Sequence, residues 1–148
     1  MAYATRADIE EFYGPTEVRK WADRDQDASA TKIEANITAA LSWATTEIDV
    51  QLSNGQTKVP FTGTVPDTIR DICRKLAGAQ LYAPRGSQDF DEQGRAVDRL
   101  RPVRAECYAK LESIRTGRII LNATLMRDSQ PFVVTDDEEE ELDPFRVT

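Results

Sequence analysis

The sequence predicts a mostly α-helical protein: a small helical bundle with an extended, proline-flanked loop or hairpin, a C-terminal β-prone arm and an acidic tail. Three observations predict this class. Apolar residues recur at intervals of three and four through most of residues 1–116. Prolines and glycines gather in one central stretch, 55–66, and break that rhythm. Beyond Gly117 the chain becomes β-prone and then strongly acidic.

Two short helices open the chain. In "TRADIEEFYG" (5–14), Thr5 can cap the first helix with Asp8 three residues further on, and Gly14 is a stop signal. The next stretch begins with Pro15, whose fixed φ suits the first turn of a helix. The sequence therefore predicts two short helices here rather than one long one.

The clearest helical pattern runs from Thr31 to about Leu52. Its apolar residues follow i, i+4, i+7 and i+8 steps, which place them on one face of a helix. They are Ile33, Ile37, Ala40, Leu41, Ala44, Ile48 and Leu52. At its start, "TKIE" reads as a capping box in which Thr31 accepts from the amide of Glu34.

A loop and two further helices follow. Residues 55–66, "GQTKVPFTGTVP", contain two prolines and two glycines, which favour an extended loop or a short hairpin. A helix is then predicted from Pro66 to about Tyr82, because proline suits a helix start. The last helix is predicted over about 89–116, with Pro102 causing a kink or a late start.

The chain divides into three parts on this reading. Residues 1–117 form a helical domain, residues 118–135 an extended interaction arm, and residues 136–148 an acidic tail. The tail contains "DDEEEELD" (136–143) and carries most of the net charge of −7. Without its seven acids and Arg146, the totals of 26 acids and 19 bases become 19 and 18, so the body is near neutral. This balance argues against a surface built to neutralise nucleic-acid phosphates.

Composition narrows the function classes further. No apolar run approaches the roughly 18 residues of a membrane span, and the N-terminus has no apolar signal core, so we expect a soluble protein made in a cytoplasm. The chain has no histidine, the usual general base. It also lacks a Gly-rich phosphate loop and a nucleophile beside a base. We therefore expect no enzyme, no catalytic or cofactor-binding residues and no cofactor.

Cys73 and Cys107 are expected to be buried free thiols, because neither lies at zinc-ligand spacing.

Residues 23–34, "DRDQDASATKIE", raise the question of a calcium site. Asp23, Asp25, Asp27 and Glu34 fall at positions 1, 3, 5 and 12 of an EF-hand loop. Position 6, however, is Ala28 where the motif requires glycine, and Glu34 has the competing capping role described above. We therefore predict a capped turn and no metal site. A calcium-responsive helical module using this loop stays open as the alternative function.

The order of several stretches resembles a family of small helical proteins from Mu-like and related tailed phages and prophages. These stretches are "YATRADIEEFYG" (3–14), "ADRDQDAS" (22–29), "EIDVQL" (47–52), "VPFTGTVPDTIRDICRKLAGAQLY" (59–82) and "AKLESIRTGRIIL" (109–121). Members of the family are placed at the head–tail junction as connector or adaptor proteins. Many of them end soon after the position of Gly117, whereas this chain continues for a further 31 residues, to Thr148.

The resemblance implies a structural virion protein in the phage neck. Such adaptors form a ring, typically of twelve copies, beneath the portal protein, and they extend the DNA channel. Their tail side offers a docking surface to a neck or tail-terminator protein, and DNA passes through without sequence-specific binding. The implied location is the head–tail junction of the virion, with the host cytoplasm as the place of assembly and no membrane involved.

Two stretches are candidate interfaces on these grounds. The loop residues Val59, Pro60 and Phe61 are apolar in a segment that cannot easily bury itself. The arm contains Ile119, Ile120 and Leu121 and later Phe132, Val133 and Val134, which can add strands to a neighbouring molecule. The alternative is that both stretches fold back and cover the bundle's own core.

Overall fold

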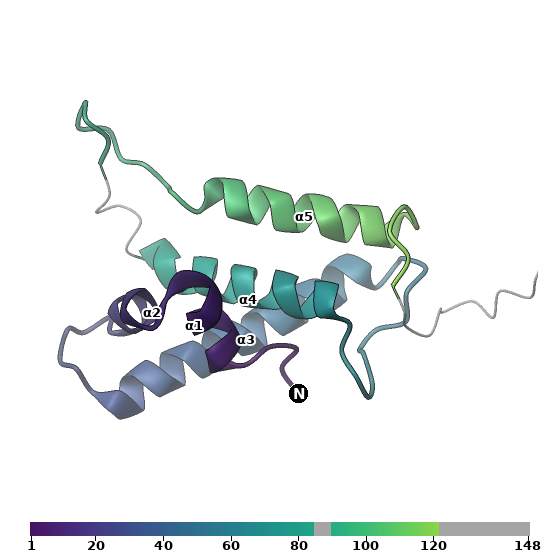
Figure 1. Cartoon of the computed structure of the whole chain (residues 1–148), viewed down its shortest axis with the longest axis horizontal. Helices are drawn as coiled ribbons and strands as arrows, with labels where there is room; N and C mark the ends of the chain where they lie inside the picture. Colours follow the sequence, from purple (N-terminus) through teal and green to yellow (C-terminus); the bar gives the residue numbers. More distant parts are fainter. Residues whose placement is uncertain (85–89, 122–148) are drawn as a thin grey trace, which may run out of the picture.

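The computed structural model describes residues 1–84 and 90–121 and shows a bundle of helices (Figure 1). Within these residues there are five helices and no β-strand, and an isolated bridge joins Phe90 to Ala96. The helices are α1 (Arg6–Tyr13), α2 (Pro15–Ala22), α3 (Ala30–Leu52), α4 (Asp67–Tyr82) and α5 (Arg101–Arg115). The predicted mostly α-helical class is confirmed.

The three long helices reverse direction one after another. Helices α3 and α4 run antiparallel and form the central pair, and α5 returns along α4 (Figure 1). The short helices α1 and α2 pack against α3 and α4. This path places the 53–66 connection and the chain beyond α5 at the same end of the bundle (Figure 1).

The core comes from the inner faces of all five helices. Every apolar residue of the predicted α3 stripe is buried, from Ile33 to Leu52. Helix α4 contributes Ile69, Ile72 and Leu76, which are 0% exposed. Fully burying an aliphatic side chain of this size stabilises a fold by about 1.5–3 kcal/mol. The faces that the sequence pattern marks as apolar are therefore the faces that hold the bundle together.

The caps at the start of the chain are formed as predicted. The amide of Asp8 donates to the Thr5 side chain at 3.3 Å, and the Asp8 carboxylate accepts from the Thr5 amide at 2.7 Å. Gly14, at φ 91°, separates α1 from α2, and Pro15 opens the second helix. The two short helices are confirmed.

The predicted capping box at Thr31 is wrong. Helix α3 begins one residue earlier, and its N-cap is Ser29, whose side chain accepts from the Lys32 amide at 3.4 Å. Glu34 instead accepts from the Arg6 guanidinium at 2.6 Å and ties α3 to α1. Two hydroxyl residues stand close together at this start, and the sequence pattern selected the wrong one.

The last helix begins much later than residue 89. Helix α5 starts at Arg101 with Pro102 in its first turn, where the missing N–H costs nothing. Before it, Asp91 donates its amide to the Arg95 carbonyl at 2.9 Å and Gly94 takes a φ of 74°, which closes a turn. Of the two effects expected from Pro102, the late start is the one observed.

Both cysteines are free and buried, as predicted. Burial raises the pKa of the Cys107 thiol to about 11, and it raises the pKa of the Cys73 thiol as well.

Across the described residues, each helix is too short or too polar to cross a membrane.

Candidate interaction surface

The 55–66 loop is attached to the helical body through Tyr3. The Tyr3 hydroxyl donates to the Asp49 carboxylate on α3 at 2.5 Å and accepts from the amide of Phe61 at 2.9 Å. The rings of Tyr3 and Phe61 meet edge to face at a centroid distance of 5.3 Å. Burial and the bond to Asp49 both raise the pKa of the Tyr3 hydroxyl, so it stays neutral at physiological pH.

The loop residues predicted as an interface differ in exposure. Val59 and Phe61 are half-buried and pack against the core, whereas Pro60 between them is exposed and follows a cis peptide bond. Residues 62–64 are exposed as well. The loop thus turns two apolar side chains inward and exposes the residues around them; we call residues 59–64 together the loop tip.

The start of the predicted arm is divided in the same way. Leu121 is 6% exposed and belongs to the core, but Ile120 is 79% exposed and Ile119 36% exposed. The amide of Ile119 donates to the Ser113 carbonyl at 3.0 Å, which fixes the exit of the chain from α5. Phe132, Val133 and Val134 lie outside the described residues, as does the acidic tail.

The loop and the start of the arm lie side by side. A Cβ added to Gly55 would come within 3.0 Å of Arg115, and one added to Gly117 within 2.8 Å of the Gln56 side chain. Figure 1 shows the two segments together at the end of the bundle where α3 stops and α4 starts. The candidate interface stretches, more than 50 residues apart in the sequence, therefore share one end of the molecule.

Tyr3 and Asp49 are the residues of this surface that sequence reasoning missed. Both act across long sequence separations, 58 residues in the case of Tyr3 and Phe61. The only sequence signal was the combination of a tyrosine and an aspartate, which occurs too often to indicate a contact. We define the candidate interaction surface as the loop tip together with Ile119 and Ile120.

The acidic loop between α2 and α3 is closed by a lysine. The Lys32 ammonium lies 2.6 Å from the Asp27 carboxylate and 3.1 Å from that of Asp25. Its hydrogen bond to Asp27 lowers the pKa of that carboxyl. Among the described residues, no group of three or more His, Cys, Asp or Glu side chains is placed to hold a metal ion.

The backbone of this loop nevertheless adopts unusual conformations. Ala28, at position 6 of the calcium pattern, has a φ of 55°, and Gln26 has a φ of 56°. The Ala28 amide donates to the Asp23 carboxylate at 3.2 Å. The carboxylates therefore serve backbone amides and Lys32, and Glu34 points to Arg6, away from this cluster.

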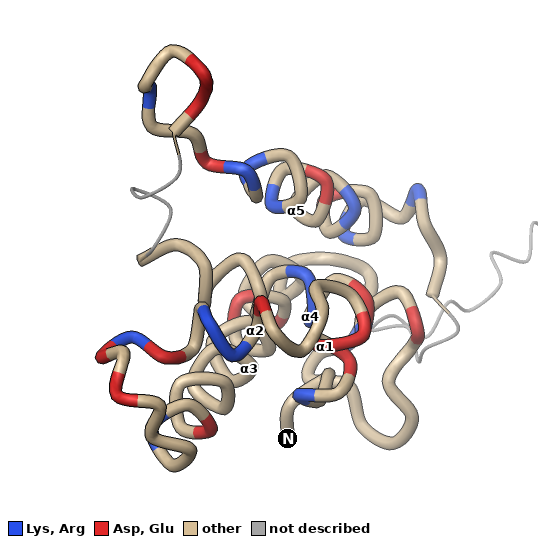
Figure 2. Tube along the Cα trace, turned by 60° about the vertical axis from the view of Figure 1, so that its left-hand side comes forward, with Lys and Arg blue, Asp and Glu red and all other residues tan. Residues whose placement is uncertain are grey.

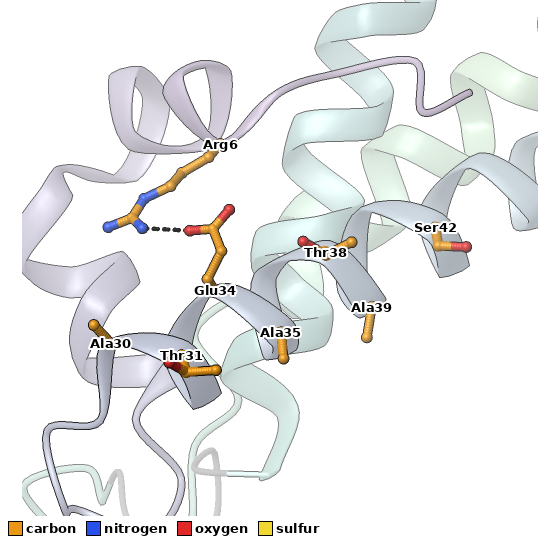
Figure 3. Close-up of a pocket in the computed structure, with 8 residues that line it drawn as sticks. All are labelled: Arg6, Ala30, Thr31, Glu34, Ala35, Thr38, Ala39 and Ser42. Carbon is orange, nitrogen blue, oxygen red and sulfur yellow. Dashed lines mark hydrogen bonds and ion pairs between the residues drawn. The ribbon is translucent and has the colours of Figure 1, made fainter.

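A shallow groove lies between α1 and the outer face of α3 (Figure 3). Its volume is about 860 Å³, and the Arg6–Glu34 ion pair spans it. The rest of the lining is small and uncharged: Ala30, Thr31, Ala35, Thr38, Ala39 and Ser42. The groove offers packing area and no reactive side chains.

Charges of both signs are interspersed over the described helices (Figure 2). Arg74, for example, pairs with Asp71 at 2.7 Å and with Glu11 at 3.4 Å, which joins α4 to α1. Arg74 and Lys75 also lie over the ring of Phe12, at 5.4 and 5.1 Å. Such mixed charge differs from the continuous basic face that phosphate binding requires.

Fold and surface together define a small helical protein that exposes Pro60, Ile119 and Ile120 at one end of the bundle. The family described as bacteriophage Mu, Gp36, matches residues 3–132. The chain therefore belongs to this family and is a Mu-like phage protein. None of the curated proteins gives a significant match.

Proposed function

We propose that the chain is a structural protein of the tailed-phage virion, which forms a ring at the head–tail junction and joins the portal to the tail. Membership of the Mu Gp36 family supports a phage role. The observation that carries the proposal is the exposure of Ile120 directly beside the buried Leu121. A chain that is fixed to its own body and then exposes an isoleucine offers that side chain to another molecule.

The location of this surface suits contact with a neighbouring copy or with the portal. Head-to-tail contacts between identical subunits close into a ring when the rotation between copies closes. The 118–135 arm, which we propose as a separate interaction segment, starts beside residues 55–56 of the loop and adds β-prone chain to a neighbour. Main-chain hydrogen bonds would supply affinity, and alternate side chains such as Phe132 and Val134 would supply specificity.

The remaining partners follow from the same role. The ring, of about twelve copies by resemblance, would extend the DNA channel and present its other side to a neck or tail-terminator protein. For the acidic tail (136–148) we propose that it repels DNA from the channel wall or binds a basic partner, with a solubilising role as the alternative. A role of this kind requires rigid packing and no catalytic residue.

Binding to isolated portal rings of the same phage tests the proposal. Mass photometry should show the wild-type chain adding to portal rings. Ile120→Asp should weaken this binding at least tenfold, because the aspartate would have to be desolvated in the contact. Phe90→Asp is the matched control, since Phe90 is 63% exposed and bridges Ala96 in the turn before α5. This turn lies at the opposite end of the bundle from the candidate interaction surface (Figure 1). Equal weakening by both variants, or no binding by the wild type, would contradict the proposal.

A further inference from the structure

The loop tip has little secondary structure to hold its shape. Among the described residues, the Phe61 amide is the one backbone donor of residues 59–64 with an acceptor in the protein, and this acceptor is the Tyr3 hydroxyl at 2.9 Å. Phe61 also rests its ring on Tyr3. A single side chain therefore supplies both the polar and the aromatic contact at the centre of the tip.

Tyr3 is itself held firmly on α3. Its amide donates to the Thr45 hydroxyl at 3.1 Å, and its own hydroxyl donates to Asp49 at 2.5 Å, one helical turn further along. The residue is 4% exposed, so water competes little for these bonds. The Thr45 hydroxyl is in turn bonded to the Leu41 carbonyl at 2.9 Å. The position of Tyr3 is thus set by α3, and the position of Phe61 is set by Tyr3.

We propose that Tyr3 is a positioning residue: through its hydroxyl it holds the loop tip in the conformation that the portal contacts. This inference rests on the proposed function, because it assigns the loop tip to that interface. When a partner binds only one conformation of the loop, its apparent affinity falls in proportion to the fraction of molecules that adopt that conformation. Ordering the tip in the free subunit therefore raises affinity without adding any contact to the partner.

Tyr3→Phe is the appropriate test, because it removes one oxygen and retains the ring that contacts Phe61. Tyr108→Phe is the matched control. The Tyr108 hydroxyl also donates to a carboxylate of α3, Glu47, at 3.1 Å, but it joins α5 to α3 rather than holding the loop. Asp49→Asn is a second variant that keeps the tyrosine and weakens its acceptor.

Two readouts separate positioning from general stability. In Tyr3→Phe, the Phe61 amide should exchange its hydrogen about five- to tenfold faster by NMR, because roughly one buried hydrogen bond is lost. The exchange rates of core amides should change no more than they do in Tyr108→Phe. Affinity for portal rings should fall by a similar factor. Tyr108→Phe should change neither the Phe61 exchange rate nor the affinity.

The possible failures point to different causes. Unchanged Phe61 exchange in both Tyr3→Phe and Asp49→Asn would overturn the proposal, as would faster exchange with wild-type affinity for portal rings. If the wild-type chain does not bind portal rings, the proposed function fails, and the exchange comparison still decides whether Tyr3 orders the loop.

Discussion

The ring of Tyr13 lies directly on Gly78. A Cβ built on Gly78 would come within 2.0 Å of the Tyr13 ring, and the Tyr13 hydroxyl donates to the Lys75 carbonyl one turn earlier on α4 at 2.8 Å. Tyr13 also meets Trp21 edge to face at 5.2 Å. The absence of a side chain at residue 78 is therefore what lets the α1–α2 pair approach α4.

Replacing Gly78 with alanine should destabilise the protein despite alanine's higher helix propensity. Propensity alone would favour Gly78→Ala by about 1 kcal/mol. The clash with Tyr13 should outweigh this gain and give a net loss of roughly 1–3 kcal/mol, typical of overpacking. Urea denaturation measures the difference. In a Tyr13→Ala background the same change should no longer destabilise, and equal effects in both backgrounds would show that the two residues are uncoupled.

Calcium should not stabilise the protein. The Lys32 ammonium lies between the carboxylates of Asp25 and Asp27, and Glu34 is committed to Arg6. Calcium at about 1 mM should therefore leave the melting temperature Tm unchanged. This concentration is roughly a hundredfold above the dissociation constants of the weakest calcium-sensor sites. Magnesium at the same ionic strength is the control. A calcium-dependent rise in Tm that Asp25→Ala abolishes would revive the calcium-responsive module.

Cys107 should react with thiol reagents much more slowly in the folded protein than after unfolding. Burial raises the pKa of its thiol to about 11, so about one thiol in a thousand is ionised at pH 8. A disulfide reagent at pH 8 should label Cys107 slowly in buffer and rapidly in urea. The variant Cys73→Ala leaves Cys107 as the single thiol for this measurement.

The same pKa gives a direction to the pH dependence of stability. Because the folded pKa of Cys107 lies above its unfolded value of about 8.5, its contribution is fully present below pH 8.5 and is lost as pH rises toward 11. Wild type should therefore lose more stability than Cys107→Ala between pH 8 and pH 10. A larger loss in the variant would contradict the assignment.

The sequence was sufficient for features that depend on neighbours along one helix. The stripe from Ile33 to Leu52 and the Thr5–Asp8 cap depend on spacings of about one helical turn between successive residues, and both were predicted correctly. The Thr31 cap failed because Glu34 pairs with Arg6, 28 residues away. The start of α5 was placed too early because an apolar pattern continues through the turn before Pro102.

The candidate interaction surface depended on contacts that no local pattern encodes. The sequence predicted the apolar residues of the loop and the arm as candidate interfaces, but it left open whether they face the core or a partner. The structure divides them, with Phe61 and Leu121 inward and Pro60 and Ile120 outward. The division depends on Tyr3 and on the approach of residues 55–57 to the end of α5, and both are set by how the helices pack.

The adjacent residues Ile120 and Leu121 should separate assembly from stability. Leu121→Ala should cost about 2–4 kcal/mol in urea denaturation, because it removes a side chain that is 6% exposed in the core. Ile120→Ala should change stability by less than about 0.5 kcal/mol, because that side chain is 79% exposed. Binding to portal rings should show the opposite order, with Ile120→Ala weakening the binding more than Leu121→Ala. Both variants are compared at a temperature well below their melting temperatures, so that both are folded. If Leu121→Ala were instead as stable as wild type, the chain would not be fixed at this point, and the exposed position of Ile120 could not be attributed to the fold.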